Sequence, residues 1–198
     1  MKNRFLLLSL VLLLTNCIYA QETVGNYYNS TFKKEYNVQA SLKSGDLTVY
    51  LFVEGYSSSD DVCFILDGEN EIISFGTALL AAKSKYEEWV AVAKLNNVTE
   101  MSKEMGISFP NIGVAWYGSE WWFDFHERIS PYFKVYDTGE CVCTIAGEAT
   151  ASTNEYIDQK YYLVLSSVDD FDNLYNALQV NSIMDALTSK QRAEDLFQ

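Results

Sequence analysis

Apolar and polar residues alternate along two neighbouring segments, 36–42 and 47–53, and this pattern predicts two paired β-strands. The segment between them, Lys43–Asp46, has Ser-Gly at its centre, as in a two-residue hairpin turn. If Lys43 pairs with Asp46, the apolar residues of both strands fall on one face. The turn type and the apolar pattern therefore predict the same register. A third strand, 62–66, follows a loop rich in Ser and Asp.

Residues 71–96 carry apolar side chains at alternating spacings of three and four, which is typical of a helix with one buried face. The apolar positions are Ile72, Phe75, Leu79, Ala82, Tyr86, Trp89 and Ala93. Near the C-terminus, Ser167 followed by two acidic residues indicates a second helix start. We expect Phe171, Leu174 and Leu178 to form the buried face of that helix. Residues 182–198 fit either a weaker helix or a frayed helical tail.

A second hairpin is predicted around the sequence Tyr117-Gly118-Ser119-Glu120, whose Gly-Ser centre favours a two-residue turn. Pairing the ends of this turn aligns Trp116 with Trp121 and places both, with Phe123, on a buried face. The opposite face would then present four candidate ligand-binding residues, Tyr117, Trp122, Asp124 and His126.

A third hairpin joins 132–136 to 140–145 through a turn at 137–139. A left-handed Gly139 would place Cys141 and Cys143 on the core face, whereas a two-residue turn would place them on the other face. Residues 147–158 are polar and are expected to form a loop before a last strand at 160–165. The pattern predicts an α+β fold, an antiparallel sheet of about seven or eight strands with one long central helix and a C-terminal helix.

The first 20 residues have the features of a cleavable secretory signal peptide. Two basic residues precede the apolar run 5–14, and Ala20 supplies the small residue before the expected cleavage point, so Gln21 would begin the mature chain. Lipidation of Cys17 is an alternative, although Asn16 replaces the small residue that normally precedes a lipidated cysteine. The remaining residues, 21–198, are expected to form one domain.

Loss of residues 1–20 makes an acidic chain more acidic. It leaves 12 of the 14 basic residues against 27 acidic ones, so the formal net charge changes from −13 to −15. This charge disfavours nucleic acid and anionic membranes as partners and favours a protein with a basic surface. The aromatic residues of the second hairpin make a glycan the alternative partner. His126 is the one histidine, and no phosphate loop or dinucleotide-binding pattern is present, so we expect no metal and no cofactor.

Three cysteines remain after cleavage, Cys63, Cys141 and Cys143, and an odd number leaves at least one thiol unpaired within the chain. Cys141 and Cys143 are two residues apart in a predicted strand, where their Cα separation would strain a disulfide. Two interpretations stay open: small buried side chains, or a disulfide from Cys63 to one of the other two.

Three functions are compatible with these patterns. The leading hypothesis is an exported, non-enzymatic binding module, because the chain is small and acidic and has no recognisable catalytic motif. The second is a carbohydrate-binding domain that uses Tyr117 and Trp122. The third is a hydrolase in which Asp124 orients His126 as a general base, although no Gly-x-Ser-x-Gly sequence accompanies them.

The run Tyr86-Glu87-Glu88-Trp89, the segment 92–99 and the later Met105 and Phe109-Pro110 resemble a family of short secreted proteins from gut-type Gram-negative bacteria. The resemblance covers about residues 35–180. It implies an extracytoplasmic bacterial location, periplasmic or secreted, and assigns no catalytic residues.

Overall fold

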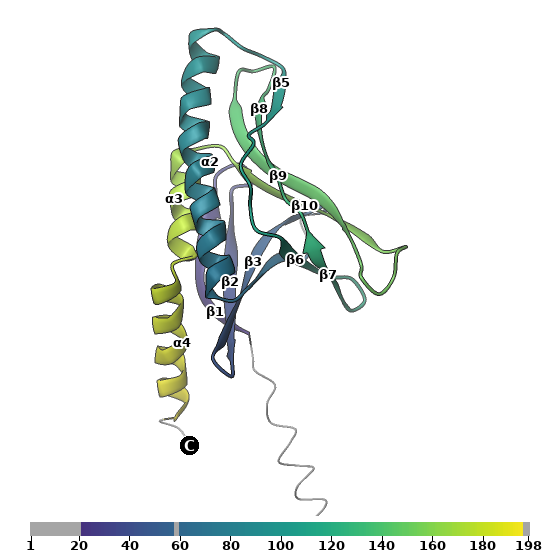
Figure 1. The fold of residues 1–198 in the computed structure, drawn as a ribbon, viewed down its shortest axis with the longest axis vertical. Coiled ribbons are helices and arrows are strands. Elements are labelled where there is room, and N and C mark those ends of the chain that lie inside the picture. Colours follow the sequence, from purple (N-terminus) through teal and green to yellow (C-terminus); the bar gives the residue numbers. More distant parts are fainter. Residues whose placement is uncertain (1–20, 58–59, 196–198) are drawn as a thin grey trace, which may run out of the picture.

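The computed structural model describes residues 21–57 and 60–195, and within them it confirms an α+β fold with an antiparallel sheet. Three helices lie together on one side of the strands, with α3 and α4 following one another beside the long α2 (Figure 1). The helices are α2 (Glu69–Leu95), α3 (Val168–Ala177) and α4 (Val180–Asp195). The strands are β1 (Glu22–Asn29), β2 (Lys34–Lys43), β3 (Asp46–Gly55), β4 (Val62–Asp67), β5 (Met101–Glu104), β6 (Ile112–Tyr117), β7 (Trp121–Glu127), β8 (Pro131–Val135), β9 (Cys141–Thr150) and β10 (Asp158–Leu165).

Strand β3 joins the two parts of the sheet. Its first residues pair with β2, and its last two, Glu54 and Gly55, pair with Tyr162 and Tyr161 of β10. On its other side β3 pairs with β4, which leads through β6 to β7. The order is β5-β8-β9-β10-β3-β4-β6-β7, with β1 and β2 branching from β3. The sheet therefore has two arms that meet at the end of β3.

The first predicted hairpin is confirmed in both turn and register. Lys43 pairs with Asp46, and the two turn residues have positive φ angles, 55° at Ser44 and 94° at Gly45. Two positive φ angles define the turn type whose twist matches that of paired strands. The apolar residues of β2 and β3 consequently face the core, where Val38 and Leu51 have no exposed surface.

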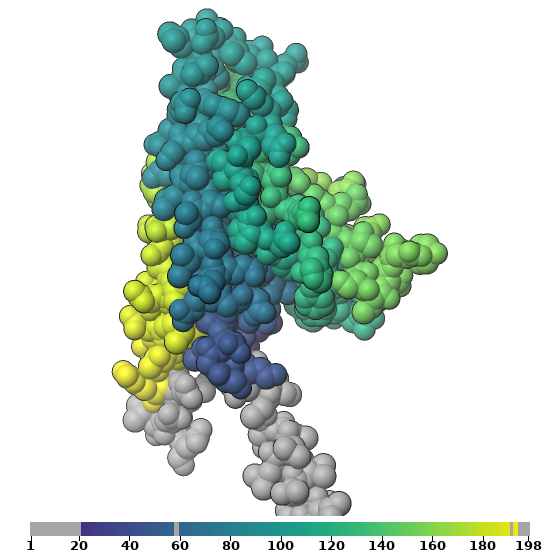
Figure 2. Space-filling model, in the orientation of Figure 1, coloured from purple at the N-terminus to yellow at the C-terminus, as the bar shows by residue number. Residues whose placement is uncertain are grey.

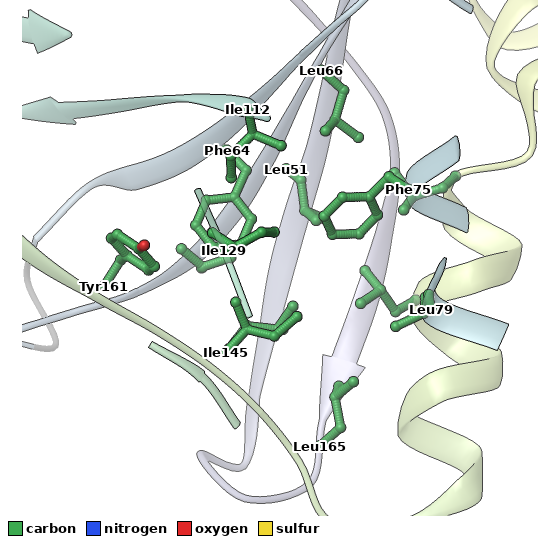
Figure 3. Packing of buried hydrophobic residues seen from close by; sticks show 14 of the residues in the cluster. Leu51, Phe64, Leu66, Phe75, Leu79, Ile112, Ile129, Ile145, Tyr161 and Leu165 are labelled. Atoms are coloured by element: carbon green, nitrogen blue, oxygen red, sulfur yellow. The ribbon is translucent and has the colours of Figure 1, made fainter. Parts of the chain in front are cut away.

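The predicted stripe of α2 is also confirmed. Six of its seven positions are buried, and Trp89 is half-buried. Phe75 and Leu79 of this helix point toward Leu51 and Phe64 of the sheet (Figure 3). Burial of such side chains contributes roughly 1.5–3 kcal/mol each. The contact between α2 and the sheet is thus a principal source of stability.

The C-terminal part of the described chain is helical. Ser167 caps α3 by accepting a hydrogen bond from the backbone N–H of Asp170 at 3.1 Å, and the Asp170 carboxylate accepts one from the Ser167 N–H at 3.2 Å. This is the capping arrangement that the sequence predicted. The weaker C-terminal segment forms α4, whose Lys190 contacts Glu22 of β1 at 2.9 Å.

Two expectations about strands were wrong. The described residues contain ten strands, more than the seven or eight expected. The two missed strands, β1 and β5, carry too little alternation to be predicted. The segment 147–158 is not a continuous loop, since β9 extends to Thr150 and β10 begins at Asp158. This longer hairpin projects from the body of the molecule (Figure 2). The third predicted hairpin takes the bulged form, with Gly139 at φ 82° and Cys143 opposite Phe133 in the core.

Candidate functional site

The β6–β7 turn contains three residues, not two. The backbone N–H of Gly118 donates to the carbonyl oxygen of Glu120 at 2.9 Å, and Tyr117 pairs with Trp121. The predicted register is therefore wrong by one residue, and such a shift moves every side chain of a strand to the opposite face. Trp122, and not Trp121, lies opposite Trp116.

The corrected register divides the four predicted site residues. Trp122 is half-buried and packs against the core, while Tyr117 is half-exposed on the other face of the sheet. Asp124 lies opposite the buried Val114, and His126 is exposed beyond it. The predicted face with Tyr117 and Trp122 side by side does not exist.

Asp124 and His126 lie at an irregularity in β7, where three steps along β7 match two along β6. The Asp124 Oδ1 atom accepts a hydrogen bond from the backbone N–H of His126 at 3.0 Å. This hydrogen bond supports the local backbone conformation. The hydrolase hypothesis required the Asp124 carboxylate to orient the His126 imidazole instead.

The shift exposes Trp121 and Phe123, which the sequence pattern had assigned to the core, on the same face as Tyr117 and Phe125. We call Tyr117, Trp121, Phe123 and Phe125 the aromatic surface. Their exposed fractions are 50, 42, 36 and 57%, respectively. The Tyr117 and Trp121 rings meet edge to face with centroids 5.6 Å apart, and the Phe123 and Phe125 rings are parallel at 5.7 Å. Contiguous exposed apolar side chains of this kind mark interaction sites.

Beside the aromatic surface lies a groove of about 400 Å³, which we call the sheet groove. Its polar lining comes from β2 and from the segment after β3, and Trp121 and Phe52 supply aromatic surface. The lining includes Asn37, Gln39, Phe52, Asp60, Asp61 and Trp121. Gln21, the predicted first residue of the mature chain, also lines it, whereas Ala20 and Cys17 lie outside the described residues.

A tyrosine pair and a carboxylate support one wall of the groove. The Tyr36 hydroxyl donates to Glu54 Oε2, which also contacts Lys34 Nζ at 3.2 Å. Tyr27 stacks on Tyr36 with centroids 5.4 Å apart and donates its hydroxyl to the Phe52 carbonyl oxygen at 2.8 Å. Burial and the hydrogen bond to Glu54 raise the pKa of Tyr36 above its ordinary value, so this group stays protonated and donating.

The three cysteines are free, buried thiols. Cys63 lies in β4, while Cys141 and Cys143 lie in β9, where the Cys143 sulfur is 3.6 Å from the Met105 sulfur. The disulfide that the sequence left open is not formed in this structure. Burial raises the pKa of Cys63 and of Cys143 to about 12.

These raised pKa values predict that the protein loses stability in alkali. The thiol pKa is about 12 in the folded state against an ordinary 9.0, so the stabilisation is complete below pH 9 and is lost between pH 9 and 12. Each such thiol should lower the free energy of unfolding by up to about 1.4 kcal/mol per pH unit in that range. Urea unfolding from pH 8 to 11 measures this effect, and Cys143→Ala should reduce the slope. An unfolding midpoint that stays constant to pH 11 would contradict it.

Comparison with protein-family models, with curated proteins and with solved structures finds no match to this chain. In the described residues, no group of three or more His, Cys, Asp or Glu side chains is placed to hold a metal ion. No helix in the same part of the chain is both long and apolar enough to span a bilayer. The candidate site must therefore be interpreted from its own chemistry.

Proposed function

We propose that the protein is an exported, non-enzymatic binding module that recognises another protein through the aromatic surface. The supporting observation is that Tyr117, Trp121, Phe123 and Phe125 lie side by side and exposed, although the fold has a separate core. Tyr, Trp and Phe are enriched at the centres of protein interfaces and carry much of the binding energy there.

The charge around the aromatic surface supports a basic partner. Glu120 lies in the β6–β7 turn, and Asp61 accepts a hydrogen bond through its carbonyl oxygen from the Tyr117 N–H at 2.9 Å, so both acidic residues adjoin the surface. The formal charge of the whole chain, −13, has the same sign. Acidic residues around an apolar centre accelerate association with a basic protein and disfavour acidic ones.

Substitutions within the surface test this proposal. Protein expressed from the full-length sequence is used to isolate binding partners, and the affinity of any purified partner is then measured by calorimetry. We expect Trp121→Ala and Phe125→Ala to weaken binding at least about tenfold, because each removes a large side chain from the interface centre. Both side chains are exposed, so the unfolding free energy should change little.

Tyr132→Ala is the matched control. Tyr132 is 40% exposed and lies in β8, on the other arm of the sheet, so its loss should leave the affinity unchanged. Binding that weakens equally in all three variants would indicate a general effect and contradict the assignment. So would a partner that binds Phe125→Ala and Trp121→Ala as tightly as the wild type, or the absence of any saturable partner.

A further inference from the structure

We propose that the sheet groove is a binding site for a neutral saccharide, with Trp121 as the stacking platform and Asn37, Gln39 and Asp61 as the hydrogen-bonding groups. This site adjoins the aromatic surface and shares Trp121 with it. It does not depend on the proposed protein partner, since Phe123 and Phe125 are not among the residues that line the groove.

The groove has the size and mixed lining that a sugar requires. Its volume, about 400 Å³, falls in the lower part of the range of small-molecule sites, roughly 300–1,000 Å³. A pyranose ring has an apolar C–H face and a rim of hydroxyl groups. Trp121, 42% exposed, offers a flat apolar ring to such a face, while the strand residues opposite offer polar groups to the rim.

The polar groups that would bind the sugar are not engaged elsewhere. The side chains of Asn37, Gln39 and Asp61 make no hydrogen bond to any described residue. Each amide supplies both donors and acceptors and the carboxylate supplies acceptors, which together match hydroxyl groups that donate and accept. Asp60 differs, because its Oδ2 atom accepts from the Ser57 N–H at 2.8 Å and from Gln159 Nε2 at 3.0 Å.

These groups are also held in place before any ligand binds. Asn37 and Gln39 are two residues apart on β2, so they project from the same face of the sheet. Strand β2 is paired on both sides, with β1 and with β3. The contacts of Asp60 tie the segment that carries Asp61 to β10. A site built on paired strands loses little conformational entropy when a ligand binds.

The same lining disfavours other small ligands. Three carboxylates line the groove, those of Glu35, Asp60 and Asp61. They outnumber the single ammonium of Lys34, which already contacts Glu54 at 3.2 Å, so the balance of charge would repel a phosphate or another anion. A metal ion is not favoured, because no group of three or more ligating side chains occurs among the described residues. A purely apolar ligand would leave the Asn37 and Gln39 amides without partners, which costs free energy. A neutral polyhydroxylated ring satisfies all of these constraints.

Four neutral oligosaccharides serve as probes: cellohexaose, maltohexaose, mannohexaose and hexa-N-acetylchitohexaose. Each is titrated into protein expressed from the full-length sequence, and binding is followed by tryptophan fluorescence and by calorimetry. We expect at least one probe to bind saturably and to change the fluorescence. Trp121→Ala should abolish binding, and Asn37→Ala should weaken it at least about tenfold, since one loses the platform and the other a hydrogen-bonding amide.

Phe125→Ala is the control, because this residue belongs to the aromatic surface and not to the groove. Phe125→Ala should leave the affinity for the saccharide unchanged and lower the affinity for the protein partner. Asn37→Ala should lower the affinity for the saccharide and leave that for the protein partner unchanged. Asn37 is exposed on β2, so its variant tests the site even if Trp121→Ala does not fold. The proposal is overturned if none of the four probes binds saturably, or if binding persists in Asn37→Ala and in Trp121→Ala.

Discussion

Replacing Asp170 with alanine is expected to lower the free energy of unfolding by about 4 kcal/mol. This residue is 2% exposed, and its carboxylate accepts hydrogen bonds from three residues in two parts of the chain. Ser30 donates through its N–H at 3.0 Å and its hydroxyl at 2.7 Å, and the N–H groups of Ser166 and Ser167 donate at 2.8 and 3.2 Å. Without the carboxylate the N–H groups of these half-buried residues lose their acceptor, which is the costly outcome.

The geometry explains why one side chain has so large an effect. Asp170 joins the β1–β2 turn to the residues that connect β10 with α3. Its loss therefore loosens the turn, this connection and the start of α3 together. It also forms half of the capping pair at the start of α3. Urea unfolding at neutral pH measures the change. Asp169→Ala is the matched control: it lies in the same helical turn and is exposed, so it should cost less than about 0.5 kcal/mol. Equal midpoints for the two variants would contradict this account.

Sequence reasoning succeeded where turn chemistry and apolar periodicity specify the same structure. The Ser44-Gly45 turn and the alternation on both sides of it each indicate one register, and that register is observed. Helix α2 has 27 residues, and its stripe from Ile72 to Ala93 is long enough for the period to be unambiguous. At α3, Ser167 and Asp170 provide an independent start signal.

The missed strands share a different property: their pairing depends on distant segments. β1 has an irregularity between Thr23 and Gly25 that breaks its alternation, and its register is set by β2. β5 has four residues, three of them exposed, and is defined by its pairing with β8. A strand whose residues are mostly polar or irregular leaves little periodicity in the sequence.

The faces of the β6–β7 side chains were mispredicted because both registers of this hairpin are plausible locally. Trp121 and Trp122 are adjacent and identical, so either can pair with Trp116 on a buried face. The contacts specific to the observed register are long-range: Phe123 accepts a hydrogen bond from the Ser152 N–H at 2.8 Å, and Glu127 accepts one from the Tyr161 hydroxyl at 2.7 Å. Neither contact is visible in the sequence around the turn, and together they place Trp121 on the groove side.

The second large effect is expected for Gly147→Ala, which should lower the free energy of unfolding by about 3 kcal/mol. Gly147 of β9 pairs with Tyr161 of β10, and the tyrosine ring lies directly over it. A methyl group at this position would lie 2.6 Å from the Tyr161 Cζ atom and closer still to the hydroxyl oxygen. No real side chain tolerates such an approach, so the ring or the strand must move.

The ring has little freedom to move. Tyr161 is 1% exposed, meets Phe64 edge to face at 5.2 Å, and donates its hydroxyl to Glu127 at 2.7 Å. Displacing the Tyr161 ring would break its hydrogen bond to Glu127, which joins β10 to β7. The register that exposes the aromatic surface would then lose one of its long-range contacts. Gly25→Ala is the control, since an added methyl group there meets no heavy atom within 4 Å. In a Tyr161→Leu background the cost of Gly147→Ala should decrease, because the obstructing ring is gone. If urea unfolding shows the same cost with and without the ring, then Tyr161 is not the reason that position 147 is glycine.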